Sequence, residues 1–482
     1  MAAVSEPGPA ARDEGGAQNL ICPAAEIFDV ARVRRDLDGA LAGAKNRRDM
    51  RKSAVTVLER ALARGRAAIA GAFNASPNNA RPAVISYAYL TDGVVRAVLD
   101  CATRHLHPLP NPTVGERLAL LAVGGYGRAE MAPHSDVDLL FLIPYKLTPW
   151  AESVIESMLY ILWDLRLDVG YASRSVADCL RLGRADFTIR TALLEHRYLD
   201  GDRGLADTLG KRLRRELFRN TGREFIEAKL AERAERHRRQ GGQRYMVEPN
   251  VKEGKGGLRD LQSLFWIDKY LHGVRHTADL LRLKLFSQEE YDKFIAAEDF
   301  LMAVRCHLHL IAGRGTDQLT FDMQVEVAQR MLYTDHGGRR AVEHFMQDYF
   351  RHATHVGELT RVFLTSLEAR HVKSEPLLVG FFRRRKKVKP GYNVVHNRLN
   401  VASDKAFLGD KLNILRIFEE ALRTGLLMHP DAMRLIAANL HLIDADMRAN
   451  PEAVRIFLDL MLKHGNPERA LRRMNELGVL AA

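Results

Sequence analysis

A pair of aspartates at the head of an apolar run is the feature that most constrains this chain. The segment HSDVDLLFLIP places Asp136 and Asp138 two residues apart in what otherwise has the pattern of a buried strand. Side chains alternate between the two faces of a strand, so both carboxylates point the same way. Two like charges on one partly buried face repel each other and need a compensating cation. Oxygen ligands of this kind suit Mg²⁺, with Mn²⁺ as the alternative.

A glycine pair precedes the aspartates by about ten residues. The apolar run LALLAV ends at Gly124 and Gly125. Glycine allows backbone amides to approach a phosphate closely. Ser135 adds a hydroxyl donor and Arg128 adds positive charge. A solvated edge strand would account for the aspartates alone, but the glycine turn and the apolar flanks favour a site for a metal-bound triphosphate.

The apolar pattern predicts a small sheet after two helical stretches. Helices are expected over about 26–72 and 83–106, with a break at 75–82. Strands are expected in ERLALLAVGG, VDLLFLI and LDVGYASRSV, and the amphipathic segment ESVIESMLYILWDLR lies between the second and the third. The order strand, turn, strand, helix, strand indicates a mixed α/β domain at about 111–205.

Helical patterns dominate the remainder, over about 206–372 and 410–475, with a loop rich in glycine and lysine at 244–262. We therefore predict an α+β fold, in which a small mixed sheet is embedded in a mostly α-helical chain. The predicted parts are a flexible tail (1–25), N-terminal helices (26–110), the sheet domain (111–205), a helical domain (206–372), and a basic linker with a helical segment (373–482).

The net charge of +12 and the pI of about 9.5 favour anionic partners, but a basic chain can also simply be soluble. The basic run FFRRRKKVKP has no interleaved aromatic platform, so a nucleic-acid partner is not expected. Four scattered cysteines without a CxxC pair argue against a disulfide framework and for the cytoplasm. No apolar run approaches the ~20 residues of a membrane span, and the N-terminus lacks the features of a secretory signal.

The stretch GGYGRAEMAPHSDVDLLFL resembles the DNA polymerase β-like nucleotidyltransferases. The resemblance implies that an acceptor hydroxyl attacks the α-phosphorus of a nucleoside triphosphate in line, with metal ions held by the Asp136 and Asp138 pair. It also implies a third carboxylate from a later strand. We assign this role to Asp168 in RLDVGYASRS, which could instead cap a turn. The other acidic residues nearby are Asp164, Asp186 and Glu195.

Three further stretches narrow the resemblance, namely LDVGYASRSVADCL, VEPNVKEGKGGLRDLQSLFWIDKY and HLIAGRGTDQLTFDMQVEVA. With the first, they resemble the bacterial PII uridylyltransferase/uridylyl-removing enzymes of nitrogen regulation, from about residue 26 to the end. This resemblance implies transfer of UMP from UTP to a tyrosine of the signalling protein PII, with release of pyrophosphate. Asp136 and Asp138 would hold Mg²⁺, Gly124 and Gly125 would cradle the phosphates, and Asp168 would help to activate the tyrosine.

The loop at 248–260 offers three cationic side chains, Lys252, Lys255 and Arg259, beside Gly254, Gly256 and Gly257. The resemblance implies that this flexible loop closes over the triphosphate or faces PII. A solvated hinge between helices is the plain alternative. His307 and His309 stand two residues apart, so they do not share a helix face and are expected to be core or surface residues rather than a metal pair.

Two departures from the family pattern stand out. Ala129 occupies a position where the family usually has glycine, which we expect to stiffen the turn without abolishing phosphate binding. Family members continue into an HD phosphohydrolase domain and two ACT domains, whereas no histidine here is followed by aspartate. We therefore expect neither uridylyl-removing activity nor glutamine sensing from this chain. The alternatives are a nucleotidyltransferase with another acceptor, such as tRNA or a small molecule, and a PII-binding module without turnover.

Overall fold

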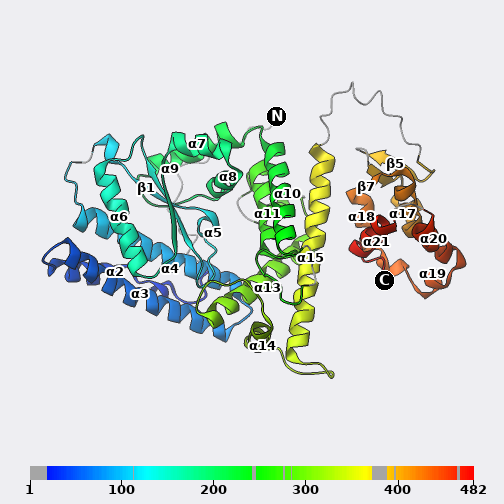
Figure 1. The fold of residues 1–482 in the computed structure, drawn as a ribbon, viewed down its shortest axis with the longest axis horizontal. Coiled ribbons are helices and arrows are strands. Elements are labelled where there is room, and N and C mark those ends of the chain that lie inside the picture. Colours follow the sequence, from blue (N-terminus) through cyan, green and yellow to red (C-terminus); the bar gives the residue numbers. More distant parts are fainter. Residues whose placement is uncertain are drawn as a thin grey trace. The chain divides into compact units, whose positions relative to one another are not determined.

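The computed structural model describes residues 19–111, 113–241, 246–274, 277–283, 285–371, 388–395, 398–463 and 467–482. The chain divides into two compact units between Thr354 and His355 (Figure 1). Among the described residues, every helix is too short or too polar to cross a membrane.

The first unit begins with a helical layer in which two of the helices start at a side-chain N-cap. The side chains of Asp29 and Asn46 accept backbone N–H groups in the first turns of two of these helices, as good N-caps do. The elements are α1 (Ala24–Ile27), α2 (Val30–Ala42), α3 (Arg47–Ala75), α4 (Ala80–Cys101) and the π-helical turn η2 (Ala102–Leu106).

A four-stranded mixed sheet follows. Its strands are β1 (Ala119–Ala122), β2 (Val137–Ile143), β3 (Val169–Ser175) and β4 (Arg197–Gly201), in the order β3-β2-β1-β4. β1 runs antiparallel to β2 and β4, whereas β2 and β3 run parallel and are joined through helix α6 (Pro149–Asp164). The three expected strands are present, and β4 was not predicted.

Helices cover both faces of this sheet (Figure 1). Leu121, Leu140 and Leu142 pack on one face against α7 (Val176–Ala185), α8 (Phe187–Leu194) and α9 (Arg203–Arg212). α4 of the N-terminal layer contacts β4, and α6 contacts β3. The two central strands, β1 and β2, are therefore apolar on both sides apart from Asp138, which packing alone does not explain.

The helical part of the first unit carries the rest of the site. It contains the π-helical turn η4 (Leu213–Phe218), α10 (Gly222–Arg239), α11 (Leu258–His272), α12 (Asp279–Arg282), α13 (Gln288–Ala312), α14 (Phe321–Arg330) and α15 (Ala341–His371), and the division between the units falls within α15. The predicted loop at 244–262 includes the start of α11, because Leu258 to Gln262 are helical.

The second unit has its own apolar core, built around Phe407, Ile417 and Phe418. It contains a small sheet that the sequence did not predict, with β5 (Tyr392–Val395), β6 (Arg398–Val401) and β7 (Leu427–Met428) in the order β5-β6-β7. Its helices are α16 (Asp404–Leu408), α17 (Asn413–Thr424), α18 (Pro430–Ala438), α19 (Ala445–Ala449), α20 (Pro451–Leu462) and α21 (Pro467–Glu476). Much of the basic run FFRRRKKVKP lies outside the described residues. Helices with two small mixed sheets confirm the predicted α+β class.

Candidate active site

The three predicted carboxylates lie where β2 and β3 begin. Asp136 immediately precedes β2, Asp138 is its second residue, and Asp168 immediately precedes β3. The parallel register pairs Val137 with Val169 and Asp138 with Gly170. Asp136 therefore stands beside Asp168, and the alternation of a strand turns these side chains to the same face of the sheet.

Two glycines make room for the carboxylate of Asp138. A Cβ atom at Gly124 would lie 2.9 Å from its Oδ2 atom, and a Cβ atom at Gly170 would lie 2.6 Å from its Oδ1 atom. Gly124 also has a φ of +60°, which L side chains rarely adopt. Gly124 and Gly125 belong to α5 (Gly124–Gly127), a single turn after β1, and Gly125 lines the cavity described below. Gly124 thus has a steric role beside Asp138, and its contact with phosphate stays a prediction.

The charge of Asp138 is poorly compensated. Burial and the neighbouring Asp136 raise the pKa of its carboxyl, Lys252 opposes this rise, and Asp168 adds to it. Within the described residues, the carboxylates of Asp136, Asp138 and Asp168 accept no hydrogen bond and form no ion pair within 4.0 Å. Paired hard oxygens that lack a partner are the donor set that Mg²⁺ prefers. Asp136 and Asp138 therefore fit a divalent cation.

Asp168 is less closely tied to such a cation. In the described parts of the chain, no group of three histidine, cysteine, aspartate or glutamate side chains is arranged to hold a metal. Asp168 is exposed, and its catalytic role stays a prediction. The other acidic residues weighed for that role have structural partners: Asp164 pairs with Arg51, Asp186 caps α8, and Glu195 is buried against Arg128.

A cavity of about 540 Å³ opens in front of Asp136 and Asp138. Three segments form its walls: residues 125–138, residues 250–262, and residues 305–318. Its lining is mostly polar and includes the cationic side chains of Arg128, Lys252, Arg259 and Arg305. Such a lining suits a polyanion that carries its own metal ion.

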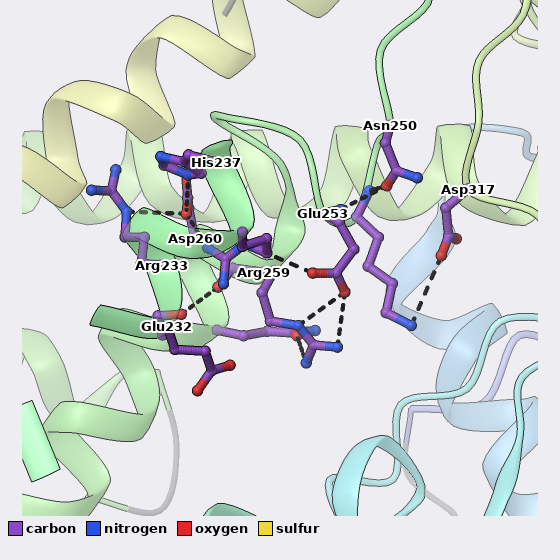
Figure 2. Close-up of polar contacts among 12 residues, drawn as sticks. Glu232, Arg233, His237, Asn250, Glu253, Arg259, Asp260 and Asp317 are labelled. Atoms are coloured by element: carbon purple, nitrogen blue, oxygen red, sulfur yellow. Dashed lines mark hydrogen bonds and ion pairs between the residues drawn. The ribbon is translucent and has the colours of Figure 1, made fainter. Parts of the chain in front are cut away.

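Lys252 projects into the cavity from a tightly built loop. The side-chain oxygen of Asn250 accepts the backbone N–H groups of Glu253 (Figure 2) and Lys252. The N–H of Arg259 donates to the carbonyl of Lys252. The Nζ atom of Lys252 lies 3.8 Å from Oδ2 of Asp317. Burial, and then the charge of Arg305, lower the pKa of this ammonium. A bound polyanion would supply the negative charge that the site lacks.

The glycines of this loop serve close packing, although the sequence suggested flexibility. A Cβ atom at Gly254 would lie 2.4 Å from the Asn250 carbonyl oxygen, and one at Gly257 would lie 2.6 Å from the Val251 carbonyl oxygen. Gly256 has a φ of +86° and fits against the backbone of α15. A larger residue at any of these positions would displace the loop that presents Lys252.

The other predicted cationic residues have partners. Arg128 bonds to Glu130 and Glu195, which raise its pKa against the effect of burial. Arg259 donates to Glu253 and Gln262. Both arginines line the cavity and are held in fixed positions.

Ser135 also lines the cavity, and its Oγ accepts the N–H of Ala132. Its hydroxyl proton can still donate to a ligand. Lys255 is half-buried and stands outside the lining of this cavity as the described residues define it, so its contact with nucleotide stays a prediction.

The sequence did not single out Arg305, His309 or Asp317 as site residues. The Nε atom of Arg305 donates to Oδ1 of Asp317 at 2.6 Å, and all three side chains line the cavity. For His309 and Asp317 the only signal was that HLIAGRGTDQLTFDMQVEVA resembled the family, and Arg305 lies just before this stretch. His309 lies at the cavity wall, whereas His307 packs elsewhere, so the expectation that they do not share a face is confirmed.

The turn after α5 holds Ala129 in the left-handed region, with φ of +59°. This conformation costs an L residue about 1–2 kcal/mol, a cost that glycine does not have. Glycine offsets part of this advantage, because its unfolded chain has more conformational freedom to lose on folding. We expect Ala129→Gly to stabilise the first unit by about 0.5–1 kcal/mol in a urea titration. Ala63→Gly, on an exposed position inside α3, should instead cost about 1 kcal/mol. Equal losses from both variants would show that Ala129 is not strained.

The chain is similar to known proteins over its whole length. Residues 224–364 match the family model described as GlnD PII-uridylyltransferase, and residues 392–482 match the model described as uridylyltransferase GlnD third domain. Among curated proteins, the chain is 62% identical over 484 residues to a bifunctional uridylyltransferase/uridylyl-removing enzyme of Cereibacter sphaeroides, which covers 100% of this chain and 52% of the relative.

Two other relatives have the same name. The protein of Ruegeria pomeroyi is 64% identical over 456 residues, covering 95% of this chain and 50% of the relative. The protein of Azospirillum brasilense is 47% identical over 458 residues, covering 94% of this chain and 49% of the relative. The chain thus spans about half the length of the curated relatives it matches.

Proposed function

The chain belongs to the family of bifunctional uridylyltransferase/uridylyl-removing enzymes, and from this premise we propose that it transfers UMP from UTP to a tyrosine of the PII signalling protein, with release of pyrophosphate. The observation that carries the proposal is the pair of uncompensated carboxylates, Asp136 and Asp138, at the mouth of a cation-lined cavity. The size of the cavity, about 540 Å³, is in the range of small-molecule sites.

In this mechanism, Asp136 and Asp138 would hold Mg²⁺, or Mn²⁺ in its place. The ion would offset charge on the attacking and leaving oxygens of an in-line displacement. Lys252 and Arg305 bind the phosphates that leave, and the exposed Asp168 receives the proton of the tyrosine hydroxyl. The bond between the α-phosphorus and the bridging oxygen breaks as the bond to the tyrosine oxygen forms, so UMP becomes attached to PII and pyrophosphate departs.

Transfer of label from α-³²P UTP to purified PII in the presence of Mg²⁺ tests the proposal. We expect label on PII that disappears with EDTA and in the Asp136→Ala/Asp138→Ala variant. Label on tRNA or on a small molecule, but not on PII, would mean that the chain is a nucleotidyltransferase with a different acceptor. A chain that bound PII but labelled nothing would be a binding module.

Lys252 provides a test of the phosphate-binding wall. We expect Lys252→Met to lower kcat/KM for UTP by about 10²-fold, because one preorganised cation aimed at developing charge contributes an effect of this size. Lys229→Met is the matched control, since Lys229 is a buried lysine of α10 that lies over the Trp266 ring. An equal loss in both variants would mean that Lys252 only stabilises the fold.

A further inference from the structure

His307 and His309 lie two residues apart on α13 and face different surroundings. The ring of His307 is 4.6 Å from that of Phe73, and its Nε2 atom is 2.9 Å from the carbonyl oxygen of Pro77. His309 is only 1% exposed and lies in the wall of the cavity. Of the two, His309 alone is placed to influence the candidate site.

One ring nitrogen of His309 holds the segment that leads into β2. Its Nδ1 atom accepts the backbone N–H of His134 at 3.2 Å, two residues before Asp136. The carbonyl group of the same residue is also closely packed, because a Cβ atom at Gly315 would lie 2.9 Å from the His134 carbonyl oxygen. An Nδ1 atom that accepts a hydrogen bond has no proton, so the ring carries its proton on Nε2.

The other nitrogen faces the wall that presents Lys252. Nε2 of His309 lies 3.5 Å from Oδ1 of Asp317, and Oδ2 of Asp317 lies 3.8 Å from Nζ of Lys252. The Asp317 backbone is joined to the same loop, since its carbonyl accepts the N–H of Val251 at 2.8 Å. His309 therefore stands where the carboxylate segment, the end of α13 and the Lys252 loop meet.

Resting on the proposed function, we propose that His309 is a positioning residue that sets the carboxylates of Asp136 and Asp138 relative to the ammonium of Lys252. His309 touches none of the reacting groups. It acts through the peptide of His134 on one side and through Asp317 on the other. Residues that orient metal ligands in this indirect way typically change metal affinity or activity by 10–100-fold when they are replaced.

Two substitutions separate the roles of the two nitrogens. Asparagine places an amide oxygen close to the position of Nδ1, so His309→Asn keeps the acceptor for His134. Glutamine places its amide close to the position of Nε2, so His309→Gln loses that acceptor. His307→Gln is the matched control, because it alters an equally buried histidine of the same helix that contacts Phe73 and Pro77 instead.

The first readout is Mn²⁺ binding by electron paramagnetic resonance, with a non-hydrolysable α,β-methylene analogue of UTP present. We expect His309→Gln to weaken Mn²⁺ binding by about 10-fold or more, and His309→Asn and His307→Gln to stay within about threefold of the wild type. The second is hydrogen exchange over residues 131–138, which should become faster in His309→Gln only.

The outcomes are distinct. If His309→Gln bound Mn²⁺ like the wild type, and lost only as much thermal stability as His307→Gln, His309 would be a core residue and the inference would be wrong. If both His309 variants lost binding equally, the contact with His134 would not be the cause, which also overturns it. A wild-type chain that bound no Mn²⁺ would overturn the proposed function itself, and the positioning role with it.

Discussion

Replacing Asp138 with asparagine should lower nucleotidyl transfer by at least about 10³-fold and at the same time stabilise the folded chain. The loss corresponds to about 4 kcal/mol of transition-state stabilisation, the size expected when a metal ligand is removed. Asparagine keeps the shape that fits between Gly124 and Gly170. The change therefore removes charge without creating a cavity.

The gain in stability follows from the direction of the pKa shift. Burial and Asp136 raise the pKa of Asp138 in the folded chain. A group with a raised folded-state pKa stabilises the fold below its unfolded-state pKa, and that contribution is lost as the pH rises through the folded-state value. At pH 7 the ionised Asp138 thus opposes folding, and its neutral replacement should add about 0.5–2 kcal/mol.

Thermal unfolding and the transfer assay together check this prediction. Asp164→Asn is the control, since this exposed aspartate at the end of α6 pairs with Arg51. We expect it to change neither quantity by much. Adding Mg²⁺ and a UTP analogue should raise Tm for the wild type and for the control, but not for Asp138→Asn, because only an intact site binds them. If the Asp138→Asn variant kept its activity, Asp138 would not be a metal ligand.

The sequence predicted the local parts of the site better than their assembly. The position of Asp136 and Asp138 at the start of a strand followed from the apolar run itself, because strand alternation is a short-range rule. The space that Gly124 and Gly170 leave for the Asp138 carboxylate depends on the parallel pairing of β2 with β3. Hydrophobic periodicity in the sequence does not reveal which strands pair. The same limit explains why β4 was missed: the short run RYLDG becomes a strand only through its pairing with β1.

The wall opposite the aspartates could not have been derived from spacing. In the sequence, Asp317 is an ordinary acidic residue of a loop. Only the fold shows that its carbonyl accepts the N–H of Val251 and that its carboxylate binds Arg305. His309 likewise has no sequence signal that separates it from His307. Only the resemblance of whole stretches pointed to this region, and it gave no roles to individual side chains.

The second large effect is expected at Asp260, which anchors the loop of Lys252 without reaching the cavity. This fully buried carboxylate accepts hydrogen bonds from Arg233 at 3.1 Å, from Arg236 at 2.5 Å, and from the N–H of Gly256 at 3.0 Å, and it lies 3.0 Å from Nε2 of His237 (Figure 2). Asp260→Asn would remove the acidic partner of Arg233 and His237 and leave Arg236 only the more distant Glu253, at 3.7 Å. Breaking a buried ion pair in this way typically costs about 3–5 kcal/mol.

The pH dependence of that loss has a definite sign. Burial opposes the ionised form of Asp260, but the hydrogen bond with His237 and the charge of Arg233 outweigh it and lower the pKa. A lowered folded-state pKa gives stability above the unfolded-state value, about 3.9 for aspartate, and this stability is lost as the pH falls further. The part of this stability that comes from ionised Asp260 should therefore be present above about pH 4 and decrease as the pH falls below it.

Chemical denaturation followed separately in the two units makes the test specific. Glu420→Gln is the matched control, because Glu420 is an equally buried carboxylate of the second unit that binds Arg423 and the N–H of Lys389. Asp260→Asn should lower the midpoint of the first unit, and Glu420→Gln that of the second. Because Gly256 is bonded to Asp260 and lies four residues after Lys252, Asp260→Asn should also weaken UTP binding where the chain remains folded. An unchanged first-unit midpoint would mean that the cations of α10 find other partners, and that the Lys252 loop is held by Asn250 and Asp317 alone.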